Sequence, residues 1–253
     1  MVKHQRRTRR VGLGLGFALL LGSPLLAQSV VPYVEVGLGR KQGDFGTPTL
    51  STLWLGYVTA GTGTARWDAS LTVPYLSLSR EGGGYSSRDW GLGDLVARGA
   101  YRFLPETEAG WSLDGLGAIK AATANEARGL GTGRTDFGGF LALHQQLGLF
   151  RWTLSGGWIQ GSSTLPSTTS VELTSGAAVV GLRGALTLDQ NRWALSFEAR
   201  GPAWQGAPGA RELSLEVLHT FSPAWGLKAA FTVGLNDGGA RQGASLALIH
   251  LFP

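Results

Sequence analysis

The sequence contains no cysteine, only four histidines and, beyond its first 27 residues, no long apolar run. Without cysteine the chain can build neither a disulfide framework nor a thiolate metal site. The absence also fits passage through an oxidising periplasm, where stray thiols would react. With histidine only at positions 4, 144, 219 and 250, acid–base and metal chemistry have few candidates. These absences already disfavour most classes of enzyme.

The chain has little net charge once its N-terminus is set aside. A formal charge of +5 and a pI near 9.9 would ordinarily favour a nucleic-acid partner. However, five of the 22 basic residues lie within the first ten positions, and the first acidic residue is Glu35. The remaining chain carries 17 basic and 17 acidic residues. The basic character therefore belongs to the leader, and we expect no nucleic-acid partner.

Residues 1–27 predict a signal peptide. A basic segment through Arg10 is followed by an apolar stretch that glycines and a Ser-Pro pair interrupt, and Ala27 supplies a small residue for cleavage. The alternative is a transmembrane anchor. A spanning helix needs roughly 20 solidly apolar residues, and this segment is shorter and richer in glycine. The sequence thus predicts a secreted mature chain of one domain, residues 28–253.

Beyond the leader the sequence alternates with period two in blocks of about ten residues, the length of a tilted strand that crosses a bilayer. In one block Asp94, Arg98 and Arg102 share one face, whereas Leu95 and Phe103 share the other. Other blocks show the same separation. The pattern predicts an all-β protein, a transmembrane antiparallel up-and-down β-barrel with apolar side chains toward lipid and polar side chains toward a lumen.

The blocks predict about twelve strands, an even number as bacterial single-chain barrels have. They lie near 30–40, 49–60, 66–79, 88–104, 110–121, 135–147, 149–160, 171–188, 192–202, 210–221, 224–236 and 241–252. Short and long connections alternate along the chain. Because outer-membrane barrels have short periplasmic turns and longer extracellular loops, we expect both termini in the periplasm.

Aromatic residues favour a membrane barrel over a soluble β-sandwich. Five tryptophans open alternate strands and three phenylalanines close strands at the same predicted level, namely Trp67, Trp111, Trp152, Trp193, Trp225, Phe103, Phe221 and Phe252. A sparser second girdle comprises Tyr75, Phe137 and Trp158. Amphipathic rings favour the membrane interface. A sandwich would have no reason to confine tryptophan to alternate strand starts.

The last strand alternates up to Phe252, which only Pro253 follows. This ending resembles the C-terminal signal that the outer-membrane assembly machinery binds, although most such proteins end in phenylalanine itself. We therefore expect the assembly machinery and outer-membrane lipid as partners, and the cell outer membrane as the location.

Short motifs within residues 71–160 resemble one family. They are Leu71-Thr72-Val73-Pro74-Tyr75, Gly91-Leu92-Gly93-Asp94-Leu95, Tyr101-Arg102-Phe103, Leu130-Gly131-Thr132-Gly133 and Asp136-Phe137-Gly138. The series resembles the outer-membrane transporters named for the meta-cleavage pathway of phenol degradation. Where that family has Pro-Thr-Gly after a lysine, this chain has Ala-Ala-Thr-Ala after Lys120. The resemblance implies a twelve-stranded type of barrel that passes small, hydrophobic or aromatic compounds.

The sequence predicts no catalytic residue, cofactor site or metal site. His144 is expected on the lumen side, His219 toward lipid, and His250 near the periplasmic rim. No Gly-x-Ser-x-Gly elbow occurs, and no helix follows the glycine-rich segment 129–133 as a phosphate loop would require. A lipid-modifying barrel enzyme that uses His144 or His250 is the least favoured alternative.

The predicted polar row inside the barrel is the most informative functional feature. It comprises Asp94, Arg98, Arg102, Asp114, Lys120, Asp136, Arg183, Glu198, Arg200, Glu212, Glu216 and Lys228. Two interpretations remain open. The charges could pair across a narrow lumen and close it, giving a non-conducting structural or surface-interaction barrel. They could instead border a water-filled path, giving a passive outer-membrane channel, which we favour. A constriction would then come from the loop of roughly 121–135.

Overall fold

The computed structural model describes residues 30–44, 50–82, 84–164, 172–202 and 208–252. The predicted signal peptide lies outside these residues. The strands are β1 (Val31–Gly43), β2 (Leu50–Gly63), β3 (Trp67–Gly82), β4 (Tyr85–Leu92), β5 (Leu95–Leu104), β6 (Trp111–Ala121), β7 (Asp136–Leu147), β8 (Phe150–Thr164), β9 (Glu172–Leu188), β10 (Asn191–Arg200), β11 (Ala210–Ser222), β12 (Trp225–Gly234) and β13 (Gln242–Leu251). A short 3-10 turn, η1 (Glu126–Arg128), lies between β6 and β7. No helix in the described ranges is long and apolar enough to cross a membrane.

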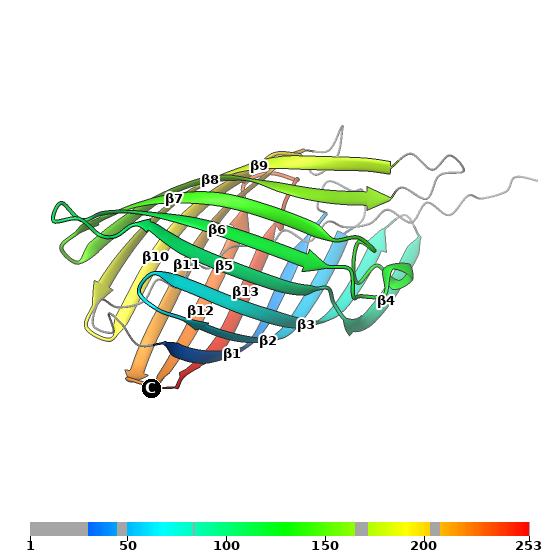
Figure 1. Ribbon diagram of the computed structural model, residues 1–253. Helices are drawn as coiled ribbons and strands as arrows, with labels where there is room; N and C mark the ends of the chain where they lie inside the picture. The colour runs from blue at the N-terminus through cyan, green and yellow to red at the C-terminus, as the bar shows by residue number, and fades with distance from the viewer. Residues whose placement is uncertain (1–29, 45–49, 83, 165–171, 203–207, 253) are drawn as a thin grey trace, which may run out of the picture.

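The strands form one antiparallel sheet that closes on itself (Figure 1). Consecutive strands pair with each other except β4 and β5, which both pair with β3; β1 pairs with β13, and the β2–β3 pairing completes the ring. Because β4 and β5 together occupy one position beside β3, the barrel has twelve strands, one of which is interrupted. The predicted fold is confirmed.

The interruption lies at Gly93-Asp94, within a segment that the sequence predicts as one strand. Tyr75 of β3 pairs with Leu92, whereas Thr72 pairs with Val96, so the partner strand carries one extra residue here. Proline at position 74 has no N–H to donate, and its carbonyl oxygen instead accepts from the Gly93 N–H at 2.9 Å. Pro74 and the extra residue together explain why the pairing with β3 ends after β4 and begins again with β5.

The loop predicted near 79–88 is mostly strand, which corrects the sequence prediction. β3 continues to Gly82 and β4 begins at Tyr85, and Gly84 has the positive φ of +77° that a tight turn requires. The residues on either side of this turn, 79–81 and 86–89, are serine, arginine, glutamate and aspartate. Because polar residues lie on both faces of the hairpin here, the sequence lacks the alternation of apolar and polar residues from which strands are predicted.

Short turns gather at one end of the barrel, here called the turn end, and most longer connections gather at the other, the loop end (Figure 1). The turn-end connections are residues 64–66, 105–110, 148–149, 189–190 and 223–224. β1 starts and β13 finishes at the turn end. That this end faces the periplasm stays a prediction.

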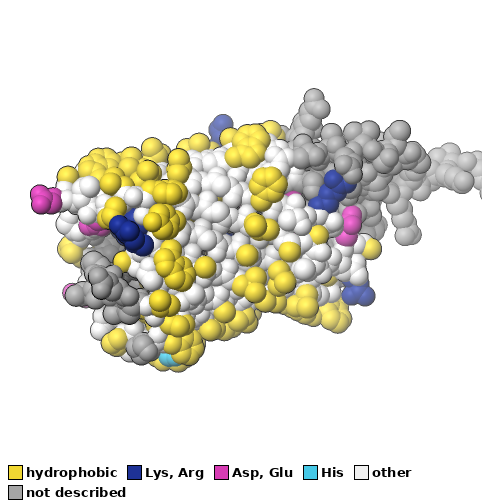
Figure 2. All heavy atoms as spheres, viewed as in Figure 1, with side chains coloured by type: hydrophobic (Ala, Val, Ile, Leu, Met, Phe, Trp, Pro, Cys, Tyr) yellow, Lys and Arg dark blue, Asp and Glu magenta, His cyan; other side chains and the backbone are white. Residues whose placement is uncertain are grey.

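The outer surface of the barrel is apolar. Leu38 is 70% exposed, and many other outward leucines, valines and aromatic residues are about half exposed. In Figure 2 charged side chains appear mostly toward the two ends, and the band between them is largely hydrophobic or uncharged. Apolar surface of this extent is unfavourable in water and suits the hydrocarbon layer of a membrane.

Candidate functional site: the lumen

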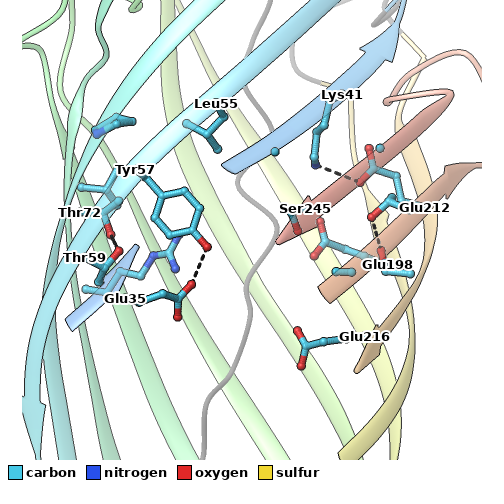
Figure 3. A pocket seen from close by; sticks show the side chains of 18 of the residues that line it. Glu35, Lys41, Leu55, Tyr57, Thr59, Thr72, Glu198, Glu212, Glu216 and Ser245 are labelled. Carbon is cyan, nitrogen blue, oxygen red and sulfur yellow. Dashed lines mark hydrogen bonds and ion pairs between the residues drawn. The ribbon is translucent and has the colours of Figure 1, made fainter. Parts of the chain in front are cut away.

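A cavity of about 450 Å³ lies inside the barrel (Figure 3). Its lining includes eight of the twelve residues predicted to face the lumen: Asp94, Arg98, Lys120, Arg183, Glu198, Glu212, Glu216 and Lys228. The other four lie beyond it: Arg102 and Asp114 form a buried pair at the turn end, Asp136 pairs with Lys120, and Arg200 ends β10. Whether any of them acts on a passing solute stays a prediction.

A buried charged network occupies the turn end of the lumen. The Asp114 carboxylate accepts two hydrogen bonds from Arg102, at 2.9 Å from Nε and 3.3 Å from the second guanidinium nitrogen. His144 Nε2 lies 3.2 Å from the same carboxylate, and its Nδ1 lies 2.8 Å from Thr153 Oγ1. His144 is 1% exposed and Asp114 is 2% exposed. Since these residues come from β5, β6, β7 and β8, the network ties four neighbouring strands together.

A second network lies beside the cavity and centres on Glu35. Its carboxylate accepts from Lys228 Nζ at 2.7 Å and from the Tyr57 hydroxyl at 2.5 Å (Figure 3). The Tyr57 ring lies over Gly37, where any added Cβ would overlap it. The missing side chain of this glycine lets the ring lie flat against the wall and leaves the lumen clear.

Sequence reasoning missed Glu35 and Tyr57. The signal was present, because Glu35 stands between Val34 and Val36 in a period-two pattern. They were missed because lumen residues were predicted from several polar residues that alternate within one strand, and Glu35 is a single charged residue in an otherwise apolar part of the first strand. Its partner Lys228 is 193 positions away.

The close ion pairs run along the wall. Arg102–Asp114 and Lys120–Asp136 join adjacent strands, while Glu35–Lys228 and Arg183–Glu216 (2.6 Å) each skip only one strand. Lys41 and Glu212, on strands further apart in the ring, are separated by 3.9 Å. In Figure 3 Tyr57 and Glu35 lie on one side of the cavity and Glu198, Glu212 and Glu216 on the other. Because these charged side chains pair with others on nearby strands, they do not reach across the barrel, and the space between its opposite sides stays unfilled.

Beside β2 and β3, the loop end of the lumen also contains an apolar cluster. Leu53 of β2 and Leu76 and Leu78 of β3 point inward and are nearly fully buried. Leu130, from the connection between β6 and β7, packs into the same cluster and is 2% exposed. The loop named from sequence as the source of a constriction therefore folds against the inner wall. Sequence reasoning missed these leucines because it assigns apolar residues to the lipid side.

Asp94 holds this loop at the interruption between β4 and β5. Its carboxylate accepts from the backbone N–H groups of Thr123 (3.1 Å), Ala124 (2.9 Å) and Thr132 (3.3 Å). Lys120 Nζ lies 3.5 Å from the same carboxylate. The Asp94 side chain thus accepts hydrogen bonds from backbone N–H groups near both ends of the loop. In a continuous sheet, carbonyl groups of a neighbouring strand would accept such bonds.

The three histidines that the structure describes, His144, His219 and His250, lie apart from one another and each contacts different neighbours. His144 is enclosed by Asp114 and Thr153. His219 Nδ1 lies 3.0 Å from Asn191 Oδ1, and the His250 ring packs 4.2 Å from Trp225 at the turn end. Across the described ranges no group of three or more His, Asp or Glu side chains could hold a metal ion.

A closed antiparallel barrel of twelve strands, apolar outside and charged inside, defines the class of outer-membrane β-barrels. Among solved structures the chain is similar to the COG4313 outer membrane channel from Pseudomonas putida F1, with a TM-score of 0.72 and 15% identity over 94% of this chain and 100% of that one. It is also similar to the NanC porin, with a TM-score of 0.55 and 10% identity over 87% of this chain and 100% of that one. The beta domain of the Bordetella autotransporter BrkA gives a TM-score of 0.51 and 12% identity, over 88% of this chain and 99% of that one. Because the sequence identities are only 10–15%, these similarities establish the fold alone.

No protein-family model and no curated protein matches the sequence. The resemblance to the phenol meta-pathway family therefore stays a prediction.

Proposed function

We propose that the protein is a passive outer-membrane channel for small molecules. The main support for the proposal is that the ion pairs join nearby strands and do not cross the lumen. Glu35–Lys228 and Arg183–Glu216 follow the wall, and a cavity of about 450 Å³ stays open between them. Charged side chains that border a water-filled lumen set the selectivity of a barrel channel. Two of the similar structures, described as a channel and a porin, add support from the same architecture.

The solutes we propose are small compounds of hydrophobic or aromatic character. The support is the apolar cluster near the loop end, where Leu53, Leu76 and Leu130 line the cavity beside its charged part. The resemblance to transporters named for phenol degradation points to the same class of compound. The cavity has the size of an ordinary small-molecule pocket, for which the range is about 300–1,000 Å³.

Single-channel conductance of the refolded mature chain in planar bilayers tests this function, with heat-modifiable gel mobility as the check on folding. Replacing Arg183 by glutamine removes a positive charge from the lumen, so the reversal potential in a KCl gradient should move toward cation selectivity. The matched control is Arg211→Gln on the exposed outer face of β11, which should leave selectivity unchanged. A folded barrel that never conducts would contradict the channel.

Two other functions make different predictions in the same experiments. A structural or surface-interaction barrel would fold and show no conductance. A lipid-modifying enzyme would release lipid products that disappear with His144→Ala or His250→Ala. The burial of His144 disfavours the enzyme, because lipid cannot reach its ring without disrupting the Asp114 network.

A further inference from the structure

Three arginines, here called the arginine cluster, meet inside the barrel near its turn end: Arg151, Arg183 and Arg192. Arg151 and Arg192 occupy the first lumen-facing positions of β8 and β10. Arg183 faces the lumen from β9, which lies between these two strands, and it lines the cavity. Arg192 is close enough to the other two arginines for their positive charges to repel it. Of the three, only Arg183 belongs to the polar row predicted from the sequence.

The wall beneath the arginine cluster consists of small residues. In the strand register Arg151 lies opposite Ala185, and Ala185 lies opposite Ala194. Both alanines are nearly fully buried, at 4% and 3% exposed. Because a methyl group reaches little beyond the backbone, the longer arginine side chains can converge over these alanines from three strands.

The arginine cluster carries more positive charge than the carboxylates beside it neutralise. Glu216 lies 2.6 Å from Arg183 and also acts on Arg192, so one carboxylate serves two arginines. The carboxylate beside Arg151 is that of Glu106, at 3.9 Å, and its side chain is 45% exposed. The neighbouring buried network adds no excess negative charge, because its own arginine already holds its aspartate. An anion is therefore favoured in this part of the lumen.

The arginine cluster also has hydrogen-bond donors to spare. The Nε atoms of Arg151 and Arg183 are buried and have no hydrogen-bond acceptor among the described residues. Another nitrogen of Arg151 makes a long contact of 3.4 Å with Ser112 Oγ. The two side chains are only 15% and 13% exposed. Since buried N–H groups require acceptors, the oxygens of a solute can fill this need.

We propose that the arginine cluster binds the carboxylate of a small aromatic acid on its way through the lumen. The inference deepens the proposed function and rests on it, because it names the class of solute. The two oxygens of a carboxylate match the parallel N–H groups of a guanidinium group. The remainder of the solute lies in the cavity, which both Arg183 and Leu76 line.

The electrostatics of the arginine cluster select the solute. Like charges repel more strongly in a partly buried site than in water, because the effective dielectric constant there is lower. A bound anion removes this repulsion, whereas an uncharged aromatic compound does not. Inorganic phosphate has the charge but no apolar part to contact the leucines of the cavity. An aromatic carboxylate combines both features.

Binding of benzoate tests the site. The refolded mature chain in lipid nanodiscs is equilibrated with radiolabelled benzoate at low ionic strength, and binding to empty discs is subtracted. We expect saturable binding. Benzyl alcohol, which has the ring without the charge, and inorganic phosphate should each compete at least about tenfold less well than unlabelled benzoate. Equal competition by benzyl alcohol would overturn the role of the arginines, and equal competition by phosphate would overturn the aromatic carboxylate.

Substitutions within the arginine cluster locate the site, with heat-modifiable gel mobility as the check on folding. Arg151→Gln and Arg192→Gln should each weaken benzoate binding about ten- to hundredfold, because each removes a charged hydrogen-bond donor. The matched control is Arg66→Gln, an exposed arginine in a turn at the same end, which should bind as the parent does. Glu216→Gln removes the carboxylate that occupies Arg183 and should tighten benzoate binding, which a purely structural cluster would not do. Parental affinity in both cluster variants would overturn the site.

A lysine variant separates a binding site from the general field of the lumen. Arg192→Lys keeps the positive charge and loses the planar pair of N–H groups. We expect about tenfold weaker benzoate binding, while the reversal potential in a KCl gradient stays near that of the parent. Parental benzoate affinity in this variant would mean that charge alone attracts the solute, and the proposed carboxylate site would be wrong.

The outcomes separate this inference from the proposed function. Saturable benzoate binding by a folded barrel that never conducts ions would support the site and count against the aqueous channel. Conductance without any benzoate binding would leave the channel standing and overturn the site.

Discussion

The buried charge network at the turn end and the leucine cluster near the loop end are built on different physical principles. At the turn end, Asp114, Arg102 and His144 form a buried network in which every member depends on its charged or polar partners. At the loop end, Leu130 packs against leucines of β2 and β3. Removing one partner from a buried charge network leaves an uncompensated charge, whereas an apolar contact can be exchanged for another apolar group. The comparison indicates a rigid charge network and an exchangeable apolar cluster within one barrel.

The largest effect should come from Asp114→Ala at the turn end. Loss of the carboxylate leaves Arg102 without its acceptor and His144 without its Nε2 partner, in a site that water reaches poorly. We expect the free energy of unfolding to fall by about 3–5 kcal/mol. Urea titration in lipid vesicles, followed by tryptophan fluorescence, measures it. An unchanged midpoint would mean that water already compensates these charges and that the turn end is not rigid.

A smaller and more local effect should follow Asp94→Ala at the loop end. Three backbone N–H groups lose their hydrogen bonds to the carboxylate, so the loop should open without unfolding the barrel. Hydrogen bonds to a charged group contribute about 1.5–3 kcal/mol, which predicts roughly ten- to hundredfold faster trypsin cleavage after Arg128. Gel analysis of timed digests measures the rate.

The matched control for this loop experiment is Asp136→Ala. Asp136 also pairs with Lys120, but it lies at the start of β7, in the wall of the barrel. Cleavage in this variant should stay within about threefold of the parent, as a partly exposed ion pair contributes about 0–1 kcal/mol. Equal acceleration by both substitutions would show that Lys120, rather than Asp94, holds the loop.

The sequence predicts the charged residues of the lumen far better than its leucine cluster, and the physics of alternation explains why. Asp114 and Arg102 stand out because a charge within an otherwise apolar strand must face the lumen. Leu53 and Leu55 face the lumen while Trp54 between them faces outward, so β2 is apolar on both faces there and periodicity carries no information.

Other features depend on register, which the sequence does not specify locally. The pairing of Glu35 with Lys228 requires that β1 and β12 flank the same strand at the right offset. The interruption at Gly93-Asp94 is hinted at only by Pro74 and the glycines opposite it. Each of these arises from how strands are staggered around the closed ring.

The smallest effects should come from two glycines that test how tightly the wall is packed between the two ends. A methyl group added at Gly37 would overlap the Tyr57 ring and push its hydroxyl away from Glu35, whereas Gly117 has no atom within 4 Å of its added Cβ. Overpacking typically costs about 1–3 kcal/mol, so Gly37→Ala should lower the free energy of unfolding by that amount. Gly117→Ala should change it by less than about 0.5 kcal/mol, or raise it, because alanine loses less backbone entropy than glycine on folding. The same urea titration compares them. If Gly37→Ala proved as harmless as Gly117→Ala, Tyr57 would have to be free to leave the wall, and the cavity beside it would no longer be bounded by a fixed ring.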